Sequence, residues 1–80
     1  MTKCPWERID DFSSRSEFER CARWLQEQVD AGVARVRQPQ SRYIGSSTLE
    51  ERWYEHMASG QTWRLVWPDP PFRGVFAPLD

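Results

Sequence analysis

The chain is poor in glycine, cysteine, histidine and lysine, and each shortage removes a class of function. The 80 residues include two cysteines and one histidine, and the four glycines are isolated at positions 32, 45, 60 and 74. No glycine-rich loop is therefore available to cradle a phosphate. Cys4 and Cys21 lack the paired spacing of a disulfide framework or a zinc site, so we expect no cofactor and no metal.

Long apolar runs are also missing. The first twelve residues, MTKCPWERIDDF, contain no apolar core like that of a secretory signal. No stretch approaches the roughly 20 apolar residues that a membrane-spanning helix needs. We therefore expect a cytoplasmic protein with reduced thiols and no membrane partner.

Neither sign of charge dominates, because 11 basic and 12 acidic residues leave a formal charge of −1. Non-specific binding to nucleic acid or to an anionic membrane needs an excess of positive charge, which this balance does not supply. Only Lys3 is a lysine, and the other basic residues are arginines. Arginine pairs with carboxylates and is enriched at binding hot spots. GC-rich bacterial coding explains the same excess, so both interpretations stay open.

Aromatic residues are abundant, with five Trp, four Phe and two Tyr. A chain of this size buries only about 60–65% of its unfolded surface, and each large aromatic buries about 150–250 Å². We expect residues 1–80 to form a single small domain with an aromatic core. Most of that core should come from residues 51–77, which hold Trp53, Trp63 and Trp67.

The clearest local signal predicts an amphipathic helix over residues 14–31. Ser14 and Glu17 form a capping-box pattern, and Gly32 stands where a glycine ends a helix. The apolar positions between them follow helical spacing: Phe18, Cys21, Ala22, Leu25 and Val29. Before this helix, Trp6, Ile9 and Phe12 should pack on the main body from either a helical turn or an extended segment.

The rest of the chain predicts strands. Residues 33–38 read as an edge strand ended by Pro39, and residues 39–48 as a loop. Residues 47–57 fit a helix or a strand, and we favour the strand because it forms a hairpin with 62–67 around Ser59-Gly60. The prolines of 68–71 force a turn, and residues 72–78 can return as a final strand.

These elements predict an α+β fold, with one helix packed on a three- or four-stranded antiparallel sheet. We expect the helix to cover one face of the sheet, formed by Trp53, Met57, Trp63, Leu65 and Trp67. The uncovered face would then present Arg52, Tyr54, His56, Arg64, Val66 and Phe76.

That uncovered face is the candidate partner-binding site, through Arg52, Tyr54, His56, Arg64 and Phe76. A rigid surface of guanidinium, phenol, imidazole and aromatic groups suits a protein with exposed carboxylates or peptide edges. A solvated sheet face with scattered aromatics has the same composition. The sequence therefore leaves binding and a plain solvated face as alternatives.

Catalysis is not indicated by the titratable residues. His56 is the only histidine, and a general base needs a nucleophile or acid within reach. Cys21 lies on the buried stripe of the predicted helix, where a cysteine acts as a small core residue. The adjacent acids 10–11 and 50–51 point apart on a regular element and read as solvated charge. We expect no enzyme.

Residues 53–76, WYEHMASGQTWRLVWPDPPFRGVF, resemble short uncharacterised single-domain bacterial proteins. The size and composition of the chain are similar to those of toxin-neutralising immunity proteins. No specific family motif is matched, so no residue roles are carried over. The resemblance implies a protein-binding module, such as an immunity or inhibitor protein that occludes a partner's surface. A single-stranded nucleic-acid-binding domain is the alternative, and a homodimer through residues 33–38 or the open face is a third.

Overall fold

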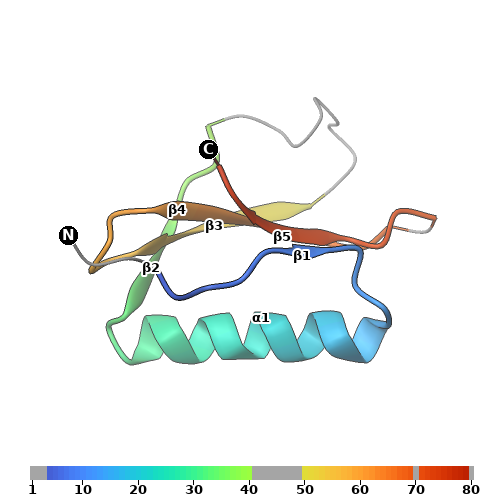
Figure 1. Ribbon diagram of the computed structural model, residues 1–80, viewed down its shortest axis with the longest axis horizontal. Helices are drawn as coiled ribbons and strands as arrows, with labels where there is room; N and C mark the ends of the chain where they lie inside the picture. The colour runs from blue at the N-terminus through green and yellow to red at the C-terminus, as the bar shows by residue number, and fades with distance from the viewer. Residues whose placement is uncertain (1–3, 41–49, 70, 80) are drawn as a thin grey trace.

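The computed structural model describes residues 4–40, 50–69 and 71–79. One helix, α1 (Arg15–Asp30), packs against a five-stranded antiparallel sheet of order β1-β5-β4-β3-β2 (Figure 1). The strands are β1 (Ile9–Asp10), β2 (Ala34–Arg37), β3 (Glu51–His56), β4 (Thr62–Val66) and β5 (Val75–Pro78). The predicted α+β class is confirmed, and the sheet has one strand more than expected.

Local capping fixes both ends of α1. Ser14 is the N-cap, and its hydroxyl accepts a hydrogen bond from the backbone N–H of Glu17 at 3.1 Å. The Glu17 carboxylate in turn accepts from the backbone N–H and the hydroxyl of Ser13. At the other end Gly32 has φ +77°, and the N–H groups of Gly32 and Val33 return to the carbonyls of Val29 and Gln28. This Schellman geometry ends the helix one residue before the predicted boundary.

The segment before α1 is extended. Ile9 pairs with Phe76 and Asp10 with Val75, so β1 adds a short strand at the β5 side of the sheet. Trp6 and Phe12 are buried in the core and Ile9 packs against it, as the sequence predicted. Of the two conformations left open for this segment, the extended one is observed.

The structure also resolves the choice between helix and strand at residues 51–56, which form strand β3. The hairpin to β4 closes where the His56 N–H donates to the Gln61 carbonyl at 2.8 Å. The second capping pattern, at residues 47–50, and most of the predicted loop at 39–48 lie outside the described residues.

The predicted assignment of side chains to the two faces of the sheet was wrong for β3 and for Phe76 of β5, which pairs with Leu65 on the α1 side. Tyr54 lies opposite Trp63, and Trp53 lies opposite Arg64. Since directly paired residues share a face, Tyr54 joins Trp63 beneath the helix and Trp53 lies on the far side. Tyr54 and Trp63 belong to the main core, together with Leu25 of α1, Leu65 of β4 and Phe76 of β5.

The face turned away from α1, called here the outer face, is not a bare surface. Trp53, Val66, Val75 and Ala77 are all buried there, with Val66 at 0% exposure. Phe72 packs against this second apolar cluster. The expectation of an uncovered face is therefore wrong for these positions. Within the described residues, the structure holds no helix with the length and apolar character required to cross a bilayer.

Candidate functional site

The five residues predicted to form one binding face do not lie on one face. Tyr54, His56 and Phe76 are buried, at 2%, 4% and 1% exposure, on the side of the sheet that α1 covers. His56 accepts a hydrogen bond from the backbone N–H of Ser59, and its ring packs edge-on against Trp6. These three side chains serve the core, so they cannot present a continuous surface to a partner.

The two arginines of that set lie on opposite faces. Arg52 is exposed and its guanidinium stands 5.6 Å from the centre of the Trp67 ring. Arg64 lies on the outer face, 3.4 Å from the carboxylate of Glu51, which also accepts from the Trp53 indole at 2.9 Å. The predicted site is therefore divided between the two faces of the sheet and its buried core.

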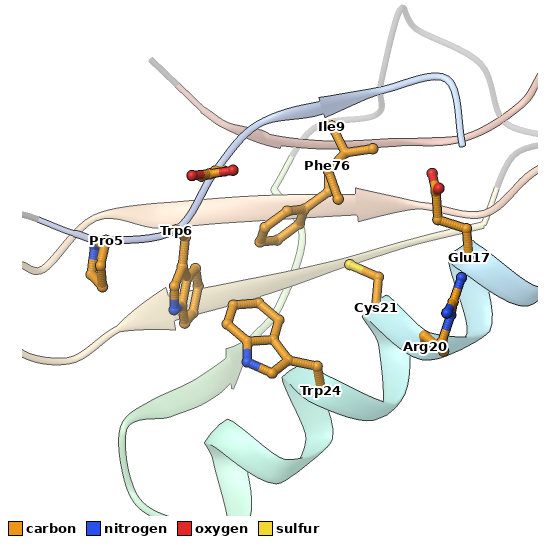
Figure 2. Close-up of a pocket in the computed structure, with 9 residues that line it drawn as sticks. Pro5, Trp6, Ile9, Glu17, Arg20, Cys21, Trp24 and Phe76 are labelled. Carbon is orange, nitrogen blue, oxygen red and sulfur yellow. The ribbon is translucent and has the colours of Figure 1, made fainter. Parts of the chain in front are cut away.

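One hollow lies between α1 and the extended segment before it, over β5 (Figure 2). This aromatic groove has a volume of about 420 Å³. Its walls are mainly apolar and come from the residues Pro5, Trp6, Ile9, Cys21, Trp24 and Phe76. Figure 2 shows the two indoles toward one end and Glu17 with Arg20 toward the other.

Ring packing holds the walls of the aromatic groove in place. Trp6 meets Trp24 edge-to-face at 5.4 Å, and both rings contact Phe76. Phe76 stacks in turn on Trp63 at 4.7 Å. Such aromatic pairs add about 0.5–1.5 kcal/mol each beyond their buried area. The groove is therefore preformed, which lowers the entropic cost of binding.

Cys21 lines the aromatic groove without being a reactive thiol. Burial, with a smaller contribution from the Glu17 charge, raises the pKa of Cys21 to about 11. The thiolate is the nucleophile, so a raised pKa suppresses covalent chemistry near neutral pH. The Glu17 carboxylate is already occupied by two hydrogen bonds from Ser13, and these bonds lower the pKa of Glu17. The chemistry of this groove is therefore that of contact with an apolar group.

A second hollow, the arginine groove, lies where the loop before β5 meets the start of α1. Its volume is about 430 Å³. Its lining consists of Phe12, Ser13, Ser14, Arg15, Pro68, Pro71, Phe72 and Arg73. Paired backbone hydrogen bonds between Asp69 and Phe72, at 2.9 and 3.0 Å, hold the loop that presents Arg73.

Strand β2 forms the other edge of the sheet. Arg35 and Arg37 both donate to Glu55, at 2.7 and 2.8 Å, and these bonds lower the pKa of Glu55. Val36 is 48% exposed, whereas Ala34 is only 3% exposed because its side chain belongs to the main core. Pairing with a second copy would set arginines near arginines, which disfavours it. A homodimer through residues 33–38 stays an untested prediction.

No family model, curated protein or solved structure matches this chain. Among the described residues, no cluster of three or more His, Cys, Asp or Glu side chains could hold a metal ion. Any assignment of function therefore rests on the geometry and chemistry of the surface.

Sequence reasoning missed both grooves because each joins segments that are distant in the chain. The signal for the aromatic groove was present in Trp24, which lies at the edge of the helical stripe. The Trp24 indole packs against Trp6 and Phe76 but remains partly exposed, so part of its surface is open to another group. The arginine groove had no comparable local signal, since Arg15 and Arg73 come to line one hollow only when the chain before β5 packs against the start of α1.

Proposed function

We propose that this protein is a non-enzymatic, cytosolic protein-binding module that takes an apolar side chain of its partner into the aromatic groove. The observation that carries the proposal is an open, preformed hollow walled by Trp6 and Trp24. Tryptophan dominates hot spots because it offers a large rigid surface at low entropic cost. Both cysteines are free, which fits a reducing compartment.

The groove is the right size for an anchoring side chain. Binding pockets for small ligands typically span about 300–1,000 Å³, and this groove lies at the lower end of that range. Interface energy concentrates where one anchor fills such a pocket and neighbouring contacts exclude water. An immunity or inhibitor protein would occlude its target in this manner.

The alternative, single-stranded nucleic-acid binding, has weaker support. Stacking of bases needs aromatic rings on an accessible surface beside a positive groove. The aromatic side chains of the central strands are buried on both faces, as at Trp53, Tyr54 and Trp63. The net charge of −1 gives no general attraction to phosphates.

The test is affinity purification of the tagged protein from its native host, with and without nuclease, followed by mass spectrometry. One stoichiometric protein should survive nuclease, and Trp24→Ala should reduce its recovery while Arg23→Ala leaves it unchanged. Arg23 lies on the same helix, is exposed and does not line the groove. Circular dichroism must show that both variants are folded. Recovery of ribonucleoproteins that vanish with nuclease would refute the proposal.

A further inference from the structure

We propose that the arginine groove is a second binding surface and that it holds an acidic peptide segment of the partner through Arg15 and Arg73. This inference deepens the proposed function and rests on it, because it assigns the charge of the partner. It uses residues separate from those of the aromatic groove.

The local charge of the arginine groove differs from that of the protein as a whole. Two guanidinium groups line it, and none of the described residues in its lining is acidic. The aromatic groove, by contrast, includes Glu7 and Glu17 beside Arg20. A neighbouring hollow that shares Arg15 also includes Glu50 and Asp69. In a chain with a formal charge of −1, such a gathering of positive charge selects an anionic group.

Both guanidinium groups remain available to a ligand. Arg73 is exposed, and no carboxylate of the described residues lies within ion-pair distance of it. Arg15 approaches Glu19 only at 3.9 Å, with both side chains more than half exposed. Such a contact contributes little, so a carboxylate with direct hydrogen bonds can displace it.

Backbone N–H groups at the start of α1 are already hydrogen-bonded to side chains of the protein. They are therefore not the source of the selectivity for an anionic group. Ser14 accepts from the Glu17 N–H, and the Glu17 carboxylate accepts from Ser13. A further negative charge would meet the charge of Glu17 at this position. Affinity for an anion must therefore come from the arginine side chains.

The lining of the groove favours a peptide over a bare anion. Pro68, Pro71 and Phe72 supply apolar surface in the same lining as the two arginines. Inorganic phosphate would leave this apolar surface uncovered. A peptide with an apolar side chain flanked by Asp or Glu would contact the apolar surface and the two arginines together. Grooves with aromatic walls receive extended peptides in several recognition domains.

The experiment is a titration of the ¹⁵N-labelled protein followed by two-dimensional NMR. The probe is the acetylated and amidated peptide of sequence EEFEE, with QQFQQ as the uncharged match and inorganic phosphate as the bare anion. The acidic peptide should shift the backbone signals of the groove, at Ser13, Ser14, Arg15, Phe72 and Arg73. QQFQQ and phosphate should each bind more weakly at these positions.

Matched variants decide whether the arginines carry the binding. Arg15→Gln and Arg73→Gln should each weaken the acidic peptide by about twofold to fivefold, the range of an exposed ion pair. Arg23→Gln, on an exposed part of α1 outside the groove, should change nothing. An acidic peptide that binds the double variant equally well, that shifts only signals elsewhere, or that does not bind would overturn the inference. Loss of partner recovery in Trp24→Ala tests the proposed function separately, so the two can fail independently.

Discussion

The close approach of Gly74, directly before β5, to the end of β4 gives the sharpest stability prediction. Gly74 has φ +88°, and a Cβ placed there would lie 2.9 Å from the Val66 carbonyl oxygen and 3.0 Å from the Phe12 ring. Gly74→Ala therefore combines an unfavourable backbone conformation with a collision against the main-chain oxygen of Val66 and the ring of Phe12. Gly32→Ala is the matched control, because Gly32 has φ +77° with nothing within 4 Å of the added atom.

The structure sets the size of the difference between the two variants. A left-handed conformation costs a non-glycine residue about 1–2 kcal/mol, which applies to both. Forcing a methyl group into a packed site adds about 1–3 kcal/mol, which applies only to Gly74. We expect Gly74→Ala to lower the free energy of unfolding by about 2–5 kcal/mol.

Urea unfolding followed by tryptophan fluorescence measures both values, with the slope of each transition checked for two-state behaviour. Because the Asp11 N–H donates to the Gly74 carbonyl at 3.2 Å, amide exchange at Asp11 should also accelerate in Gly74→Ala. A Gly74→Ala protein no less stable than Gly32→Ala would refute the close approach described for Gly74 and the end of β4.

Three further perturbations test other parts of the structure. Ser14→Ala should cost about 0.5–2 kcal/mol of stability by removing the helix cap, and an unchanged urea midpoint would contradict the capping geometry. Burial raises the pKa of Cys21 to about 11. In a Cys4→Ser background, alkylation of Cys21 near neutral pH should therefore be about 100-fold slower than that of a thiol with the usual pKa of 9.0. Mass spectrometry measures the alkylation rate, which should equal that of the ordinary thiol only after the protein is unfolded. The pKa of Glu55 is lowered by its two arginine partners, so its contribution is present above the usual value of 4.5 and is lost as the pH falls through the folded-state value. Glu55→Gln should therefore lower the urea midpoint at neutral pH and reduce its fall on acidification, and an unchanged acid slope would contradict the pairing.

The helix could be predicted because its signals are local. The Ser14 cap, the spacing of apolar residues and the glycine at 32 act within a few residues of one another, and the structure places α1 at Arg15–Asp30. The final strands were similarly bounded by prolines and by the Ser-Gly turn. Alternation within each strand was also correct, since β4 places Trp63 and Leu65 on the side of α1.

The faces of β3 could not be predicted from its own residues. Its two alternating sets each mix one aromatic with charged groups, with Trp53 between glutamates and Tyr54 between an arginine and a histidine. The choice is made by the register of the hairpin, which pairs Tyr54 with Trp63 and not with Arg64. A shift of one residue would exchange every side chain between the faces. This ambiguity placed Tyr54 and His56 on the wrong face, and Phe76 of β5 was misplaced separately, because it pairs with Leu65 on the α1 side.

The most direct test of the central claim is an NMR titration of the five tryptophan indole signals with the purified partner. The indole N–H groups of Trp53 and Trp63 donate within the protein, to Glu51 and to Gln61 at 2.9 and 2.8 Å. If the partner fills the aromatic groove, the signals of Trp6 and Trp24 should move on binding while that of Trp53 stays in place. A partner that moves the Trp53 signal and leaves Trp24 unchanged would contradict the aromatic groove as the binding site.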